Sequence, residues 1–123
     1  MAYIPQGAKW YLAEIVQQIV VDGDDSSLVH VNLTLIRADS PEEAYERSLE
    51  VGRQGEMAYQ NTDGKTVAIT FRGLRNLHVI HEQLEHGSEI LHEEIRDLSE
   101  SDVTDLLRSK AHLNIFRPRV NVD

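Results

Sequence analysis

Residues 28–55 read LVHVNLTLIRADSPEEAYERSLEVGRQG, and this stretch decides the fold more than any other part of the chain. In its first half, apolar side chains recur at every second position (Val29, Val31, Leu33 and Leu35). Side chains of a strand point alternately to its two faces, so these four share one face that is suited to a core. We therefore expect a strand whose opposite face is mixed, with His30, Asn32, Thr34 and Ile36.

The second half of the stretch changes to a helical pattern. Ser40 can cap the start of a helix, Pro41 suits the first helical position, and Glu43 lies three residues after the cap. These signals predict a helix over Pro41–Gln54, and Gly55 is a suitable stop. The expected apolar stripe consists of Ala44, Tyr45, Leu49 and either Val51 or Gly52.

The segments on either side supply the other elements. Residues 9–22 (KWYLAEIVQQIVVD) are rich in β-branched side chains, which favours a strand, although the spacing also fits a helix. The polar residues 22–27 then predict a hairpin turn into the strand at 28–36. Further strands are expected at 57–61, at 67–72 with an interruption at Gly73, in a second hairpin made by 77–84 and 88–95, and at 113–116, with a short helix at 101–110.

This order predicts an α+β fold: a mostly antiparallel sheet of five to six strands with the main helix on one face. The short C-terminal helix closes an edge or an end of the sheet. One domain is expected over 9–117, after a loose N-terminal lead-in at 1–8 and before a C-terminal tail at 118–123. Long hairpin strands leave unpaired edges, so we also expect a homodimer that forms through a sheet edge.

Composition excludes several classes of function. The chain has no cysteine, which rules out disulfides, thiolate zinc sites and cysteine catalysis. Neither a signal peptide nor an apolar run of about 20 residues is present, so we expect a soluble cytoplasmic protein. The net charge is −9, with 21 acidic and 12 basic residues, which makes binding to nucleic acid a poor expectation.

The acidic residues are unevenly distributed. Nine of them lie between Glu82 and Asp105, where Arg96 is the one Lys or Arg residue. A solvated face that aids solubility accounts for this pattern. The alternative is a surface that steers a basic partner protein, and its candidate residues lie on the expected second hairpin: Glu82, Glu85, Glu89 and Glu93.

Five short motifs occur in a familiar order along most of the chain: WYLAE (10–14), VHVN (29–32), ADSPEEAY (38–45), YQNTDG (59–64) and FRGLRNL (71–77). In this combination the chain resembles the bacterial domain-of-unknown-function 4288 family, roughly from Lys9 to Phe116. The resemblance implies a small intracellular bacterial domain. It implies no activity and no catalytic residue, because every matched motif can serve the fold alone.

Histidines and carboxylates interleave in the predicted second hairpin. Both are ligands for zinc and similar divalent ions, which need three or four ligands at one point. Hairpin pairing would bring His81 near His92, which makes these two the candidate metal ligands. Surface histidines on an acidic hairpin explain the same pattern without any metal, and no cofactor is expected.

A second candidate site surrounds Gly73. Arg72, Arg75 and Asn76 flank it, and Tyr59 is expected on the same sheet. An arginine fork on an exposed sheet face can bind a carboxylate or phosphate, so these four residues are the candidate small-ligand site. The alternative is a bulge at Gly73 whose arginines pair with nearby acids.

Catalytic motifs do not emerge from the sequence. No serine lies in a Gly-x-Ser-x-Gly elbow, and neither a phosphate-binding glycine loop nor a dinucleotide fingerprint is present. Three hypotheses for the function remain. The first is a non-enzymatic protein-interaction module with an acidic surface, of which an inhibitor or immunity protein would be one instance; the second is a small-ligand sensor; the third is a metal-dependent activity at the histidines.

Overall fold

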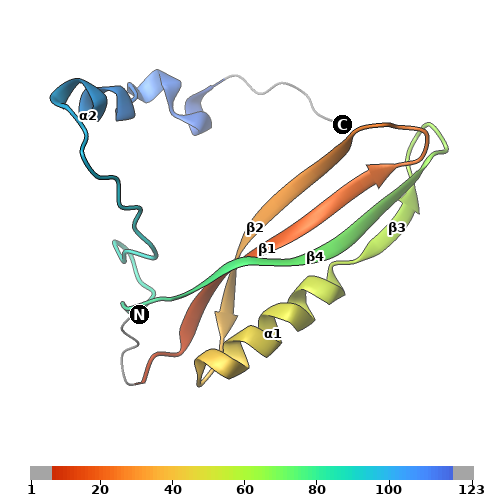
Figure 1. The fold of residues 1–123 in the computed structure, drawn as a ribbon, viewed down its shortest axis with the longest axis horizontal. Coiled ribbons are helices and arrows are strands. Elements are labelled where there is room, and N and C mark those ends of the chain that lie inside the picture. Colours follow the sequence, from red (N-terminus) through yellow and green to blue (C-terminus); the bar gives the residue numbers. More distant parts are fainter. Residues whose placement is uncertain (1–6, 118–123) are drawn as a thin grey trace. The chain divides into compact units, whose positions relative to one another are not determined.

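The computed structural model describes residues 7–117 (Figure 1). Its elements follow the order β1 (Trp10–Val21), β2 (Ser27–Arg37), α1 (Pro41–Gln54), β3 (Met57–Gln60), β4 (Thr66–Val79), α2 (Glu100–Leu106) and two 3₁₀ turns, η1 (Lys110–His112) and η2 (Asn114–Phe116). This confirms the α+β class with one antiparallel sheet and two helices. The hairpin between the first two strands and the bounds of α1 match the predictions.

The chain divides into two compact units. The first, residues 1–91, holds the sheet and α1, and the second, residues 92–123, holds α2 and the 3₁₀ turns. The single domain predicted over 9–117 spans the described part of both units and stays a prediction.

The sheet has four strands in the order β2-β1-β4-β3, with every neighbouring pair antiparallel. The prediction of five to six strands is wrong for the described residues. Residues 77–79 finish β4, but residues 80–98 contain no strand, so the second hairpin does not form. Several Glu residues, Gly87 and Asp97 lower the strand propensity there. Residues 113–116, also predicted as a strand, contain η2.

β4 continues past Gly73, where an interruption was predicted. Its pairing with β1 shifts register twice, and each shift leaves one residue of β4 without a partner: Arg72 and Arg75. Such extra residues are β-bulges, which bend a strand and re-aim the bulged side chain. Gly73 lies between them with a φ of 133°, a backbone conformation that L side chains rarely adopt.

Helix α1 packs on one face of the sheet through small side chains. Its buried positions recur every four residues at Ala44, Ser48 and Gly52. A Cβ atom at Gly52 would lie 2.3 Å from Cε1 of Phe71, so the helix backbone and β4 are in close approach. Tyr45 and Val51, which were expected in the apolar stripe, are exposed. Bulky side chains at the buried positions Ala44, Ser48 and Gly52 would hold the helix away from the sheet.

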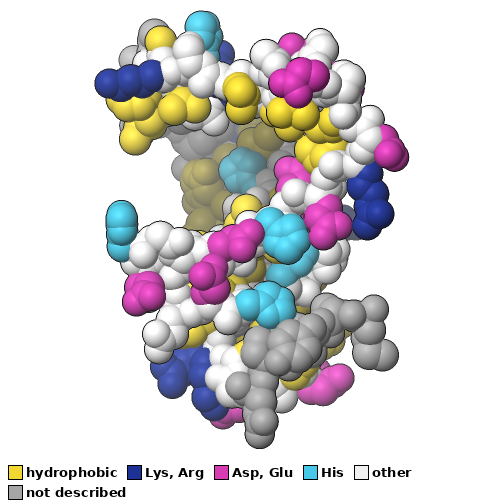
Figure 2. All heavy atoms as spheres, turned by 90° about the vertical axis from the view of Figure 1, so that its left-hand side faces the viewer, with side chains coloured by type: hydrophobic (Ala, Val, Ile, Leu, Met, Phe, Trp, Pro, Cys, Tyr) yellow, Lys and Arg dark blue, Asp and Glu magenta, His cyan; other side chains and the backbone are white. Residues whose placement is uncertain are grey.

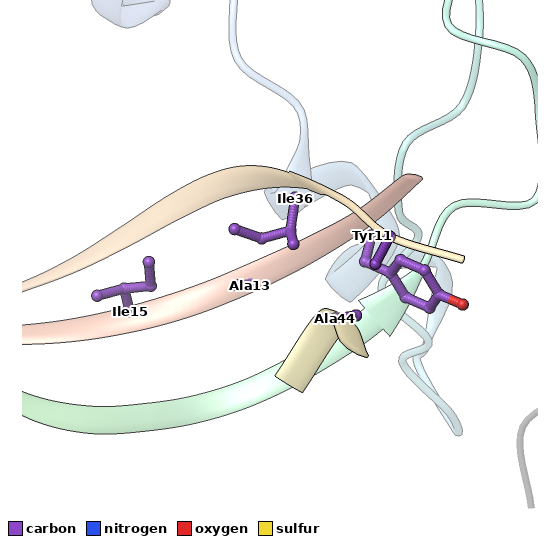
Figure 3. Close-up of a cluster of buried hydrophobic side chains, with 6 residues drawn as sticks. Tyr11, Ala13, Ile15, Ile36 and Ala44 are labelled. Carbon is purple, nitrogen blue, oxygen red and sulfur yellow. The ribbon is translucent and has the colours of Figure 1, made fainter. Parts of the chain in front are cut away.

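The core lies between α1 and this face. Tyr11, Ala13 and Ile15 of β1 contribute to it with Ile36 of β2 and Ala44 of α1 (Figure 3). The predicted core face of β2 is therefore the wrong one: Val29, Leu33 and Leu35 are exposed and Ile36 is buried. Alternation alone misleads here because the chain turns directly from β2 into α1, which covers the Ile36 side.

The second unit begins with residues outside any helix or strand and continues into α2. Ser99 and Asp102 form a reciprocal capping box at the start of α2, which is shorter than the predicted helix at 101–110. Every described residue from 91 to 117 is exposed. Within residues 7–117, no helix is long and apolar enough to cross a membrane.

Candidate functional site

A buried carboxylate marks the sheet face opposite α1. Glu14 lies on β1 between Ala13 and Ile15, which both point into the core under the helix, so its side chain points the other way. Only 9% of that side chain is exposed. An ionised carboxylate at such a position needs hydrogen-bonding partners to offset its lost hydration.

Two residues of β4 supply those partners. Nε of Arg75 donates to Oε1 of Glu14 at 2.5 Å, and Nε2 of His78 contacts Oε2. Arg75 reaches the carboxylate because it is a bulged residue, whereas His78 lies opposite Leu12 in the regular register. Both oxygens of Glu14 are therefore engaged.

These contacts set the charge state of Glu14. The hydrogen bond from His78, followed by that from Arg75, lowers the pKa of the Glu14 carboxyl below its ordinary value of 4.5, against the opposing effect of burial. A carboxylate that stays ionised and accepts from two donors is a weak proton acceptor at neutral pH. The network therefore ties β1 to β4 and fixes side chains on this face.

The other bulged residue behaves similarly. Nη1 of Arg72 donates to Oε1 of Gln18 at 3.1 Å. The predicted ligand-binding arginines thus both contact side chains of β1. Oδ1 of Asn76 accepts from the backbone of Leu77. Tyr59 lies opposite Val67, in phase with Phe71 under α1, so it belongs to the other face. The structure does not bring these four predicted site residues together.

Exposed apolar side chains lie beside the Glu14 network on the same face. Leu33 is the direct cross-strand neighbour of Glu14, and Leu35 is that of Leu12. The exposed fractions are 61% for Leu33, 46% for Leu35 and 53% for Val29. We call the surface made by these three leucine and valine side chains of β2 the open face. Apolar side chains that form a contiguous patch on a protein surface are suited to contact with another molecule.

The backbone of β2 is also available along one side, since β2 is an edge strand (Figure 1). Ala38 donates its N–H to the Lys9 carbonyl, which places the even-numbered residues of β2 against β1. The backbone groups of Ser27, Val29, Val31, Leu33 and Leu35 then point away from the sheet. The next outward carbonyl, that of Arg37, accepts from Nη1 of Arg47 on α1.

The predicted acidic surface has no hairpin beneath it. Glu82 accepts from the Glu89 backbone N–H, and Glu85 begins the turn that ends at Ser88. Glu93 belongs to the second unit and is exposed. Acidic and histidine side chains are interspersed on the face shown in Figure 2. The acidic residues predicted to bind a partner are therefore present in a segment that forms no hairpin.

The predicted metal ligands belong to different units. His81 lies in the first unit, and His92, whose Nε2 is 3.5 Å from Glu94, lies in the second. Among residues 7–117, no group of three or more His, Cys, Asp or Glu side chains is arranged to hold a metal ion. The hairpin that would have joined the two histidines does not form.

A cavity of about 560 Å³ lies at the start of β1, next to Trp10. The Arg37 guanidinium stacks over the Trp10 ring at 5.9 Å from its centroid, and both residues line the cavity. Across from them the lining includes Ile80, His81, Glu82 and Glu85. Sequence reasoning missed this cavity because the segment after β4 was assigned to a hairpin.

The Glu14 network was missed as well. Its partners lie 61 and 64 positions away along the chain, so no local pattern reveals them. One signal was present: Glu14 is the single charged residue in the apolar run WYLAEIV, residues 10–16. A lone charge at such a position predicts a partner from another strand.

Comparison with known proteins gives one match. The sequence model of a family described as "Domain of unknown function (DUF4288)" matches residues 10–92. The matched range coincides with the unit that holds the sheet and α1. No curated protein and no solved structure matches the chain.

Proposed function

Since the chain belongs to the DUF4288 family, which is defined without an assigned activity, we propose that it is a non-enzymatic protein-interaction module. Its contact surface is the β2 side of the sheet, made of the open face and the outward-pointing backbone of that strand. The observation that carries the proposal is the exposure of Val29, Leu33 and Leu35 beside the buried Glu14 network.

The physical reason lies in the asymmetry of the sheet. One face is partly covered by α1 through small residues, while the other presents apolar side chains next to a buried polar network. Transfer of apolar area from water favours association by about 25 cal/mol per Å². The contacts of Glu14 with Arg75 and His78 tie β1 to β4, and β1 pairs with β2 along the whole length of β2, so little order needs to be gained on binding.

The acidic segment after β4 is a second contact surface in this proposal, separate from the β2 side. Glu82 and Glu85 are exposed and lie in a chain of net charge −9. Such a surface accelerates encounter with a basic partner and does so less at higher salt. Replacement of both residues by Gln should slow association and flatten its salt dependence, with little effect on dissociation.

The experiment is a quantitative capture from native lysate. The immobilised full chain is compared with a Leu33→Ser/Leu35→Ser variant and with a matched Met57→Ser/Tyr59→Ser control. The control removes two apolar side chains that are equally exposed but lie on the other edge strand, β3. We expect loss of a stoichiometric partner with the first variant only. Equal capture by all three proteins would contradict the proposal.

A further inference from the structure

The backbone N–H and C=O groups of β2 that point away from β1 form a run with two defined ends. It begins at Ser27 and runs to Leu35, because the Arg47 side chain already occupies the carbonyl of Arg37. The centre of this unpaired run is Val31. An antiparallel pair made by two copies of one strand has a twofold axis at its centre, so each contact occurs twice.

From this we infer that the partner of the β2 side is a second copy of the chain, paired antiparallel through β2 with Val31 opposite its own counterpart. This inference rests on the proposed function and names the partner for the same surface. The two four-stranded sheets would form one continuous sheet of twice that width.

This register makes the side chains complementary. Val29 of one copy lies opposite Leu33 of the other, and Val31 lies opposite Val31. All of these side chains are on the side of the sheet that carries the open face. On the α1 face, His30 lies opposite Asn32. Directly opposed side chains on one face are the contacts that stabilise a pair of strands, and here they are apolar.

Charge complementarity selects the same register. Positions that sum to 62 oppose one another when Val31 is at the centre. At both ends of the pairing, this brings Arg37 of one copy toward Asp25 in the turn before β2 of the other copy. Asp25 is exposed, and its segment leads directly into β2. No acidic residue occurs from Ser26 to Arg37, so two chains of net charge −9 meet along a stretch free of like negative charge.

The edge also lacks the usual protection against pairing. Native edge strands carry lysine, proline, bulges or a very short length that prevents association with another strand. β2 has eleven residues, and its register with β1 is unbroken along the whole pairing. Between Leu28 and Ile36 it contains neither lysine nor proline.

The test is the mass of the full chain by sedimentation equilibrium across a range of concentrations. We expect a dimer of twice the 14.0 kDa chain mass. Val31→Lys should raise the dimer dissociation constant tenfold or more, because it places two lysines opposite each other. Thr70→Lys, an exposed position on the inner strand β4, is the matched control and should leave it unchanged.

Charge exchange tests the register itself. Asp25→Arg alone should weaken the dimer, and the double variant Asp25→Arg/Arg37→Asp should restore it. The chain has no native cysteine, so Val31→Cys should give a dimer cross-linked by one disulfide under mild oxidation, while Thr70→Cys should not. These readouts do not depend on the stability of any single variant.

A monomer at every concentration, or a dimer unaffected by Val31→Lys and by the charge exchange, would overturn the inference. Neither result would refute the proposed function if capture of another protein still depends on Leu33 and Leu35. The proposed function fails separately if the Leu33→Ser/Leu35→Ser variant changes neither capture nor self-association.

Discussion

Glu14 and Leu33 are direct cross-strand neighbours, yet one is among the most buried charged side chains of the chain and the other among its more exposed leucines. Arg75 and His78 approach Glu14 from β4, while Leu33 stands on the opposite side, on the edge strand. A polar network thus supports an apolar surface. This relationship is what a rigid contact surface requires, since the backbone beneath it is fixed before a partner arrives.

Replacement of Glu14 tests the network. We expect Glu14→Gln to lower the free energy of unfolding by about 1–3 kcal/mol, because an amide cannot accept at both oxygens from the Arg75 and His78 donors. Urea denaturation of the variant measures this change. Glu50→Gln on the exposed side of α1 is the control and should stay within about 0.5 kcal/mol of the wild type. Equal effects of the two variants would show that the Glu14 contacts contribute no stability.

The same residue should make stability depend on pH. Folding lowers the pKa of Glu14 from its ordinary value of 4.5, through the hydrogen bonds from His78 and Arg75. A depressed carboxyl pKa stabilises the folded state above the unfolded pKa, and this contribution is lost as the pH falls through the folded pKa. The difference in unfolding free energy between wild type and Glu14→Gln should therefore be constant well above pH 4.5 and should shrink as the pH falls below about 4.5. A difference that stays constant as the pH falls below 4.5 would contradict the assignment.

Gly52 tests the close packing of α1. Alanine at an exposed helix position gains about 1 kcal/mol over glycine, but here its Cβ would lie 2.3 Å from the Phe71 ring. Overpacking costs about 1–3 kcal/mol, so we expect Gly52→Ala to destabilise the fold. Adding Phe71→Leu should recover part of the loss in a double-mutant cycle, and Arg53→Ala is the control on the same turn. A stabilising Gly52→Ala variant would mean that the helix lies farther from β4.

The start of α1 offers a local prediction. Oγ of Ser40 accepts from the Glu43 backbone N–H at 3.1 Å, which satisfies one of the amide groups left free at a helix start. We expect Ser40→Ala to reduce the unfolding free energy by about 1 kcal/mol. The midpoint of thermal denaturation is compared with that of Ser26→Ala, which changes an exposed serine in the turn between β1 and β2. Identical midpoints for the two variants would be inconsistent with a capping role.

Local signals predicted the local structure well. The Ser40, Pro41 and Glu43 pattern fixed the start of α1, and the polar residues 22–27 fixed the first hairpin. Neither depends on distant parts of the chain, so the sequence contains all the information needed. The hairpin predicted over 77–84 and 88–95 does not form, because many of its residues are acids that cannot supply apolar pairs to hold two strands together.

The site depends on long-range relationships that periodicity does not contain. Apolar residues occupy both faces of β2, so alternation could not decide which face α1 covers. The bulges at Arg72 and Arg75 depend on the pairing of β4 with β1, and the contacts of Glu14 cross more than sixty positions. Two of the candidate residues around Gly73, Arg72 and Arg75, are the bulged residues of β4. Their partners, Gln18 and Glu14, were not identified.

The most direct test of the contact surface is residue-resolved amide hydrogen exchange along β2 by NMR, on the full chain at low and at high concentration. In the isolated chain, the amides of Val29, Val31 and Leu33 should exchange fast and those of His30 and Asn32 slowly, because only the latter face β1. At high concentration, the odd-numbered amides should become protected and the Leu33 and Leu35 methyl signals should shift. Fast exchange and unchanged methyl signals at every concentration would contradict association of the chain with itself through the β2 side. If a protein captured from the lysate also left the exchange rates and the methyl signals of β2 unchanged, the β2 side would not be a contact surface.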